Sequence, residues 1–312
     1  MPFFSIIIPT YKNPDILKTV MDSVLSQTFQ DFEMIITDDS PDDQVKDFIE
    51  AQYKDDRIIY FQNRVALGTP ENWNSGIKKA SGEWIKLLHD DDWFAADNAL
   101  ERFAEAINKN PDAKVFHCDY ENVFLDGGYY AKPRAGQYLK KQFKENKFTL
   151  VSRNFIGPPS VVLTHSSLEF NYDGALKWMV DIDYYMRIAL KTEFVYIPRV
   201  LVKVGVSKKQ VTAYTHNVPE IEIPEALHVF EKWKHKKPWQ NIVYFDAWWR
   251  LIRNLGIRNV DELKRLAVDR EIPGFVVCIL QVQRRIPHWL LKFGPFSKMA
   301  MGCSFLNCSK KN

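Results

Sequence analysis

The chain has 312 residues, of which 46% are hydrophobic and 26% are charged, and its formal net charge is +3. This length allows one large or two modest domains with a real core, and the nearly balanced charge gives no indication of a nucleic-acid partner. Acidic residues are frequent in the N-terminal half and basic residues after Ser207. This asymmetry suggests an acidic, metal-using half followed by a basic tail.

The four cysteines, Cys118, Cys278, Cys303 and Cys308, form no Cys-x-x-Cys pair. In a domain of this size the pattern predicts reduced thiols in a cytosolic protein rather than a disulfide framework. No basic and apolar leader precedes the strand-like segment that begins at Phe3, so we expect no signal peptide. No run of about 18 apolar residues occurs, which predicts no membrane-spanning helix.

Strand-like and helix-like runs alternate from the N-terminus. Short apolar runs predict buried strands, and apolar residues at helical spacing predict the helices between them. The predicted order is strand 3–8, helix 16–25, strand 32–37, helix 45–49, strand 57–61, helix 72–80 and strand 83–88. This alternation predicts an α/β fold with a doubly wound, mostly parallel sheet.

Further elements follow with less regular spacing. We predict a helix at 98–108, strands at 114–120 and 122–125 before a turn at Gly127 and Gly128, a strand at 160–163, a helix at 180–190 and a strand at 195–204. Beyond Ser207 the chain is richer in aromatic residues, and helices are predicted at 225–234, 239–255 and 260–269. The pattern therefore predicts a catalytic domain at 1–207 and a helical C-terminal region at 208–312.

Polar residues follow the first two predicted strands. Pro9, Thr10 and Tyr11 end the first strand, and Asp38 and Asp39 end the second, so both groups are expected at one rim of a parallel sheet. The ring of Tyr11 can stack on a base, and either carboxylate can accept a hydrogen bond from a pyrimidine or a ribose. An ordinary turn and a helix start explain the same residues. No Gly-x-Gly-x-x-Gly or Gly-Lys-Thr loop is present, which argues against a dinucleotide cofactor or ATP.

A loop from Asn63 to Gly68 leads into the third predicted helix. Arg64 in this loop can contact a phosphate, and Gly68 permits a tight bend. An ordinary strand-to-helix connection is the alternative interpretation.

Three consecutive acids, Asp90, Asp91 and Asp92, follow the fourth predicted strand. Adjacent carboxylates repel one another unless a cation or hydrogen-bond donors offset their charge. A divalent ion such as Mn2+ or Mg2+ takes oxygen ligands of this kind, and open α/β sheets bind ligands at this end of their strands. An acidic turn ahead of a helix that starts near Asp97 is the alternative. For His89 we expect a structural or supporting role.

Asp181 and Asp183 lie at the start of the helix predicted at 180–190. A carboxylate in the first turn of a helix is stabilised by the helix dipole, and such residues are commonplace. A carboxylate near a metal-bound substrate can instead act as a general base toward an incoming hydroxyl group.

Taken in order, these motifs resemble one family. They are Pro-Thr-Tyr after the opening strand, Asp-Asp-Ser after the second, Asn-x-x-x-x-Gly and Asn-x-Gly, Ala-Ser-Gly-Glu-Trp-Ile, the acid triplet and Asp-x-Asp-Tyr-x-x-Arg. Over about residues 3 to 205 the chain is similar to the family-two inverting glycosyltransferases, which use nucleotide-sugars and have the GT-A fold, a Rossmann-like doubly wound sheet.

The resemblance implies a nucleotide diphosphate-sugar donor, with a UDP-sugar favoured, and Mn2+ or Mg2+ as cofactor. It also implies a role for individual residues. Pro9, Thr10, Tyr11 and Asp38 or Asp39 would hold the base, Arg64 would face the diphosphate, Asp90 would lie near the ribose, Asp91 and Asp92 would bind the metal, and Asp181 would be the catalytic base.

Two positions depart from the pattern of the family. Val180 replaces the acid that usually precedes the base, and Ser207 stands near the position of a frequent metal-binding histidine. These departures imply either a weaker affinity for the metal or an ion that is held mainly by Asp91 and the diphosphate. His216, further along the chain, is expected to be an exposed loop residue.

By this resemblance the protein is expected to transfer a sugar, with inversion, to a hydroxyl group of a glycan or a lipid-linked acceptor. One base suffices if a metal stabilises the leaving diphosphate, whereas a glycosidase would need paired carboxylates. A sugar nucleotidyltransferase would use the same substrates, but no Gly-rich basic loop follows the first strand. The alternative is a catalytically degenerate subunit that binds nucleotide-sugars and scaffolds an active partner, for which Val180 and Ser207 leave room.

From Ile272 onward, apolar and aromatic residues alternate with Lys and Arg. Such a segment can lie in a membrane interface, and packing on the catalytic domain or a contact in a homo-oligomer is the alternative. A lipid-linked acceptor would suit membrane binding. We therefore expect a cytoplasmic protein that this segment can hold on the inner face of the plasma membrane, where it extends a bacterial cell-surface glycan.

Overall fold

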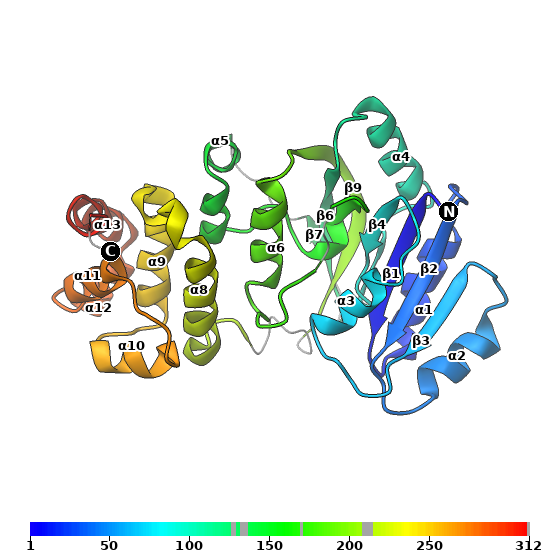
Figure 1. Ribbon diagram of the computed structural model, residues 1–312, viewed down its shortest axis with the longest axis horizontal. Helices are drawn as coiled ribbons and strands as arrows, with labels where there is room; N and C mark the ends of the chain where they lie inside the picture. Colours follow the sequence, from blue (N-terminus) through cyan, green and yellow to red (C-terminus); the bar gives the residue numbers. More distant parts are fainter. Residues whose placement is uncertain (126–128, 132–136, 169–170, 208–214, 311–312) are drawn as a thin grey trace. The chain divides into compact units, whose positions relative to one another are not determined.

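The computed structural model describes residues 1–125, 129–131, 137–168, 171–207 and 215–310 (Figure 1). The chain forms two compact units whose segments alternate along the sequence. The first unit comprises Met1–Arg134, Ile156–Gly174 and Arg187–Gln210, and the second comprises Ala135–Phe155, Ala175–Met186 and Val211–Asn312. The division into domains at residue 207 stays a prediction.

The first unit contains every described strand. The strands are β1 (Phe4–Thr10), β2 (Phe32–Asp38), β3 (Ile58–Gln62), β4 (Trp84–Leu87), β5 (Asp92–Phe94), β6 (Val115–Phe124), β7 (Tyr129–Ala131), β8 (Val162–His165) and β9 (Phe194–Val206). They form one sheet in the order β3-β2-β1-β4-β8-β6-β9-β5, and β7 pairs with β6.

The helices divide between the two units. The helices of the first unit are α1 (Pro14–Leu25), α2 (Gln44–Gln52), α3 (Glu71–Ile77) and α4 (Ala99–Lys109), with the short η2 (Pro159–Val161). Helix α6 (Val180–Ala189) begins in the second unit. The other elements of the second unit are α5 (Gln137–Glu145), η1 (Lys147–Ser152), α8 (Pro219–Trp233), η3 (Lys234–Lys236), η4 (Pro238–Gln240), α9 (Ile242–Asn254), α10 (Val260–Ala267), α11 (Gly274–Gln283), α12 (His288–Lys292) and α13 (Gly294–Cys308).

Four neighbouring strands, β3, β2, β1 and β4, run parallel to one another, as the alternating pattern predicted. Every residue of β1 and β2 is buried, because both faces of a parallel sheet are covered. Helix α3 packs closely on one face at Gly76, where an added Cβ atom would lie 2.3 Å from Cγ2 of Ile7. The predicted α/β fold is therefore confirmed.

The other half of the sheet is mixed, because β8 pairs antiparallel with both β4 and β6, and β5 pairs antiparallel with β9. The two strands predicted at 114–120 and 122–125 are one strand, β6, whose pairing with β9 shifts register around Asp119. Strand β5 is too short to predict from a pattern, and it begins at Asp92. The turn expected at Gly127 and Gly128 lies outside the described residues.

The second unit is helical, with large aromatic residues such as Phe245, Trp249 and Phe275 buried in its core. Helix α8 begins six residues earlier than the helix predicted at 225–234 and contains Pro224. Helices α5, α11, α12 and α13 are additions to the prediction. Among the described residues, none of the helices combines the length and the apolar character needed to cross a membrane.

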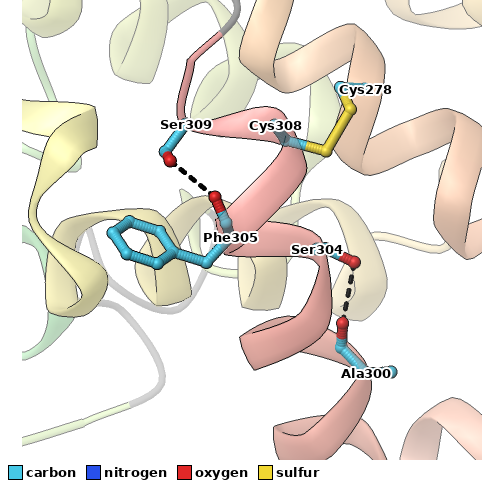
Figure 2. Close-up of a disulfide and its surroundings, with 6 residues drawn as sticks. All are labelled: Cys278, Ala300, Ser304, Phe305, Cys308 and Ser309. Atoms are coloured by element: carbon cyan, nitrogen blue, oxygen red, sulfur yellow. Dashed lines mark hydrogen bonds between the residues drawn. A yellow bond between two sulfur atoms is a disulfide. The ribbon is translucent and has the colours of Figure 1, made fainter.

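A disulfide joins Cys278 of α11 to Cys308 of α13, with 5.6 Å between the two Cα atoms (Figure 2). Cys118 is a buried free thiol and Cys303 an exposed one. The expectation of four reduced thiols is therefore wrong for one pair. Thirty residues separate the two bonded cysteines, so their proximity depends on how α13 folds back on α11 and is not visible in local spacing.

Candidate functional site

The carboxyl ends of β1 and β2 lie side by side, with Thr10 opposite Asp38 in the parallel register. The Asp38 carboxylate is buried and accepts hydrogen bonds from the backbone N–H of Ser40 at 2.8 Å and from the Tyr60 hydroxyl at 2.7 Å. Backbone N–H of Asp39 donates to the Thr10 carbonyl at 3.0 Å. The two predicted base-binding segments are therefore adjacent in space.

Asp39 shapes the loop that follows β3. Its carboxylate accepts hydrogen bonds from Nδ2 of Asn63 at 2.8 Å and from the backbone N–H groups of Leu67 at 3.1 Å and Gly68 at 2.8 Å. Gly68 has φ of +72°, a left-handed conformation that favours glycine. Arg64 lies exposed on the loop that these bonds hold. Asp39 thus holds this loop in place next to the carboxyl ends of β1 and β2.

Tyr11 connects β1 to the acid triplet. Its ring is exposed, and its backbone N–H donates to Oδ2 of Asp90 at 3.3 Å. Burial, together with the neighbouring charge of Asp91, raises the pKa of Asp90 to about 7. The ends of β1, β2 and β4 therefore meet at one rim, where Asp90 holds its proton unusually tightly.

Asp91 and Asp92 are positioned by β9. The backbone N–H of Gly205 lies 3.0 Å from the Asp91 carbonyl and 3.1 Å from Oδ1 of Asp92. A Cβ atom on Gly205 would lie 2.2 Å from the Asp91 carbonyl oxygen, so only glycine fits here. Asp92 is buried, and burial together with the Asp91 charge raises its pKa well above the ordinary value. This close contact explains why the Val204–Ser207 segment has glycine at position 205.

His89 joins the acids, although the sequence suggested only a supporting role for it. Ligand atoms of His89, Asp91 and Asp92 all lie within 4.8 Å of one another. Burial, followed by the charge of Lys86, lowers the pKa of His89 to about 4, so the imidazole is neutral near neutral pH. Its Nε2 is buried and has no hydrogen-bond partner among the residues that the structure describes. A neutral imidazole and two carboxylates form a donor set that fits Mn2+ or Mg2+.

The orientation of His89 is set by its surroundings. Its backbone N–H donates to the Ser160 hydroxyl at 3.0 Å, and its ring lies against Trp73, with 4.6 Å between the ring centroids. Nδ1 lies 3.7 Å from Oδ2 of Asp92. A histidine directly before an acid triplet is the only local signal that could have identified this residue.

Asp181 belongs to the second unit, at the start of α6. Its Oδ2 accepts a hydrogen bond from Nδ2 of Asn154 at 2.6 Å, and its Oδ1 accepts one from the backbone N–H of Ile182 at 2.7 Å. The side chain is partly exposed. Asn154 therefore fixes the orientation of the carboxylate, and the helix dipole stabilises its charge. The role of Asp181 as the base stays a prediction.

Glu225 of α8 organises the same helix end. Its carboxylate accepts hydrogen bonds from the backbone N–H groups of Lys177, Trp178 and Met179 at 2.8 to 2.9 Å. These groups precede α6, and a buried N–H without a partner would be costly. Glu225 is itself buried, and burial raises its pKa. Sequence reasoning missed it because the contact spans more than forty residues.

Asp183 differs from Asp181 in its environment. It is fully buried, and Nζ of Lys232 lies 2.9 Å from its Oδ1. A buried carboxylate paired in this way anchors α6 to α8. Of the two acids in the predicted motif, only Asp181 is open to solvent.

The second unit contains a cavity of about 220 Å3, which is lined by Ile182, the residue that follows Asp181 in the sequence. Its lining combines apolar residues with a few polar groups, among them Trp178, Ile182, Glu222, Tyr244, Trp248 and Arg250. The Arg250 guanidinium is held by Asp246 at 3.1 Å and by the Ser152 carbonyl at 2.8 Å. Such a mixed lining is typical of pockets that bind small organic groups.

Comparisons with known proteins point to one family. A model of the family described as Glycosyl transferase family 2 matches residues 5–168. An uncharacterized glycosyltransferase of Methanocaldococcus jannaschii is 28% identical over 248 residues, which are 78% of this chain and 84% of that protein. The GalNAc(5)-diNAcBac-PP-undecaprenol beta-1,3-glucosyltransferase of Campylobacter jejuni is 32% identical over 171 residues, which are 54% of this chain and 54% of that protein.

Two solved structures share the fold. The structure of S. aureus TarS 1-349 in complex with UDP has a TM-score of 0.60 at 18% sequence identity. The matched part is 98% of this chain and 89% of the TarS chain. The mannosyltransferase PcManGT from Pyrobaculum calidifontis, in complex with GDP-Man and Mn2+, has a TM-score of 0.55 at 14% sequence identity. The matched part is 99% of this chain and 86% of the PcManGT chain.

Proposed function

This chain belongs to glycosyl transferase family 2, and from that premise we propose that it moves a sugar from a nucleoside diphosphate-sugar to a hydroxyl group of a lipid-linked glycan, with inversion. The observation that carries the proposal is the meeting of Tyr11, Asp38 and the acid triplet at one rim of the sheet. The Campylobacter relative, whose name includes an undecaprenol diphosphate, supports the lipid-linked acceptor.

On the donor side, the exposed Tyr11 ring stacks on the base, and Pro9 and Thr10 form the floor below it. Ser40 and Tyr60 already orient the Asp38 carboxylate. This supports its proposed role of accepting a hydrogen bond from the base or the ribose. Arg64, on the loop that Asp39 holds, contacts the diphosphate. A UDP-sugar remains the favoured donor.

Asp91, Asp92 and His89 would hold Mn2+ or Mg2+, since their donor atoms lie close enough to share one ion. Such an ion supplies positive charge opposite a leaving diphosphate. Asp90 remains next to the Tyr11 backbone and binds the ribose. The structure of PcManGT with GDP-Man and Mn2+ supports the use of a divalent ion.

On the acceptor side, Asp181 takes the proton from the attacking hydroxyl group. Asn154 holds one of its oxygens, which leaves the carboxylate pre-oriented for this transfer. We place the acceptor sugar in the 220 Å3 cavity that Ile182 lines, where the Trp178 and Trp248 rings offer apolar faces and Arg250 offers hydrogen-bond donors. The proposed location is the cytoplasmic face of the membrane, where nucleotide-sugars are available.

The proposal is tested by calorimetry and by release of nucleoside diphosphate, with UDP-glucose, UDP-GlcNAc and GDP-mannose in the presence of Mn2+ or Mg2+. We expect one donor to bind in a metal-dependent way and to be turned over when a lipid-linked glycan is added. Binding without turnover by any acceptor would favour the scaffold alternative, for which Val180 and Ser207 leave room. The absence of binding by every donor would contradict both.

The role of the base is tested by Asp181→Asn, with Asp261→Asn as the matched control because Asp261 occupies the first turn of α10 and is exposed. We expect Asp181→Asn to lower turnover at least about 100-fold while donor affinity is retained. Near-normal turnover by this variant would reject Asp181 as the base.

A further inference from the structure

Helices α12 and α13 carry an exposed apolar surface, called here the outer face. It consists of Trp289, Phe293, Met299 and Leu306, whose exposed fractions are 72%, 59%, 61% and 69%. Met299 and Leu306 are seven residues apart, so they lie on the same side of α13. The exposed Cys303 lies between them. Large apolar side chains grouped in this way mark a surface that another body covers.

Helix α13 has apolar residues on both of its sides. Its inner side buries Met301 and Cys308 together with Ser297 and Ser304, while Met299 and Leu306 face outward. The Ser297 hydroxyl accepts hydrogen bonds from Nε1 of Trp249 and from Nη1 of Arg253, both at 3.0 Å. Because these contacts would break if the helix rotated, the outer face cannot turn inward.

A further feature holds α13 in this orientation. The disulfide between Cys278 and Cys308 fastens the end of the helix to α11, while the buried Ser304 hydroxyl donates within the helix, to the carbonyl of Ala300 at 2.7 Å (Figure 2). The outer face is therefore a fixed surface and not the result of a loosely attached tail.

The charged residues of the segment that carries the outer face are all basic, and one of them, Lys298, is paired with Asp246 of α9 at 3.0 Å. Residues 272–312 contain no Asp or Glu. The exposed basic residues of this segment in the described part of the chain are Arg284, Arg285, Lys292, Lys298 and Lys310. Arg284, Arg285 and Lys292 give the surroundings of this apolar surface an excess of positive charge, which is complementary to a surface that is apolar inside and anionic outside.

We propose that the outer face docks on an anionic lipid bilayer, with Trp289 and Phe293 at the depth of the headgroups. Tryptophan favours this interfacial zone, and Lys and Arg nearby are attracted to lipid phosphates. Binding through a helix face needs no membrane-spanning segment. The inference rests on the proposed function only in that a lipid-linked acceptor is reached at a membrane.

A second copy of the chain fits the outer face less well. In a two-fold symmetric dimer the same patch meets itself, so the basic residues of both copies would approach one another with no acid in the segment to offset them. A bilayer that contains phosphatidylglycerol supplies the missing negative charge.

The test is flotation of the full chain with vesicles of phosphatidylcholine and phosphatidylglycerol in equal parts, and with vesicles of phosphatidylcholine alone. We expect binding to the anionic vesicles and at least about tenfold weaker partitioning for the double variant Trp289→Ser, Phe293→Ser. Arg285→Glu with Lys292→Glu should weaken binding to anionic vesicles alone. The matched control is Leu190→Ser, an exposed leucine outside the outer face.

Equal flotation of the wild-type chain and the double variant would overturn the proposal, as would failure of the wild-type chain to float. A dimer in sedimentation experiments that the double variant abolishes, without flotation, would assign the outer face to a second copy. Donor binding is measured by calorimetry without vesicles, so a failure of membrane docking is distinguished from a failure of the proposed function.

Discussion

At the scale of single residues, Lys86 is the least expected side chain of the sheet, because it is fully buried in β4. Its Nζ donates to the carbonyl oxygens of Ser160 and Val162, and it lies 5.5 Å from the ring centroid of Phe103. Burial lowers its pKa from 10.5 to about 8, although the nearby Cys118 and Asp92 act in the opposite direction. Burial of the charged ammonium group in this apolar layer therefore raises the free energy of the folded state.

This pKa predicts how stability changes with pH. Below about pH 8 the lysine is charged in both the folded and the unfolded state. Burial of that charge then lowers the free energy of unfolding by roughly 3 kcal/mol. Between about pH 8 and 10.5 the unfolded chain binds more protons than the folded one, so this group raises the free energy of unfolding as pH rises. We expect Lys86→Met to flatten this rise in urea unfolding measured across that range. An unchanged slope in the variant would contradict a lowered pKa.

Gly205 offers a second test at this scale. Gly205→Ala would force a Cβ atom against the Asp91 carbonyl and displace the acid triplet. We expect metal-dependent donor binding to weaken by at least about tenfold, because a shift of this size disturbs a preorganised site. The control is Gly302→Ala, where an added Cβ meets nothing within 4 Å. If both variants bind donor as the wild type does, the proposed metal residues are wrong.

At the scale of elements, the start of α6 depends on α8. Glu225→Ala would leave three backbone N–H groups without their acceptor. We expect the free energy of unfolding to fall by about 1–3 kcal/mol, and turnover to fall more than donor affinity because Asp181 lies on this helix end. Glu220→Ala, an exposed acid in the first turn of α8, is the control. Equal losses from both variants would show that Glu225 has no special role.

The disulfide between α11 and α13 gives a prediction that depends on redox conditions. Reduction, or Cys278→Ser with Cys308→Ser, should lower the free energy of unfolding by about 2–4 kcal/mol, because the cross-link restricts the unfolded chain. Cys303→Ser should have no such effect, since this thiol is free and exposed. Denaturant unfolding with and without reductant measures the difference. Four titratable thiols in the native protein, as expected in a reducing cytoplasm, would contradict the bond.

At the scale of the whole molecule, metal and donor should stabilise the protein together. A donor at 100 times its dissociation constant adds about 2.7 kcal/mol to the free energy of unfolding. Because Asp91 and Asp92 repel without a cation, we expect a chelator to remove this gain and Mn2+ to restore it in thermal unfolding. His89→Ala should raise the Mn2+ concentration needed for half the effect. Full donor stabilisation in the presence of chelator would exclude metal-assisted binding.

The sequence alone determined the architecture of the parallel strands and most of the candidate site. Apolar runs and helical spacing are local signals, so β1, β2, β3 and β4 were predicted close to their observed bounds. The carboxyl ends of parallel strands share one edge, and this rule predicts from the sequence that Tyr11, Asp38 and the acid triplet lie together. The C-terminal region was correctly predicted to be helical, but the individual helices after residue 270 were not located, because α13 carries little contrast between its sides.

The tertiary structure decided everything that depends on contacts between distant segments. The end of β4 brings His89 close to Asp91 and Asp92, which makes it a candidate metal ligand. The need for glycine at position 205 follows from the close approach of β9 to the acids, where the backbone N–H of Gly205 lies 3.1 Å from Oδ1 of Asp92. The capping of α6 by Glu225 and the bond between Cys278 and Cys308 likewise join residues that no periodic pattern relates. Local preferences fix where a strand or helix forms, whereas register and packing fix which side chains meet, and those are properties of the folded chain.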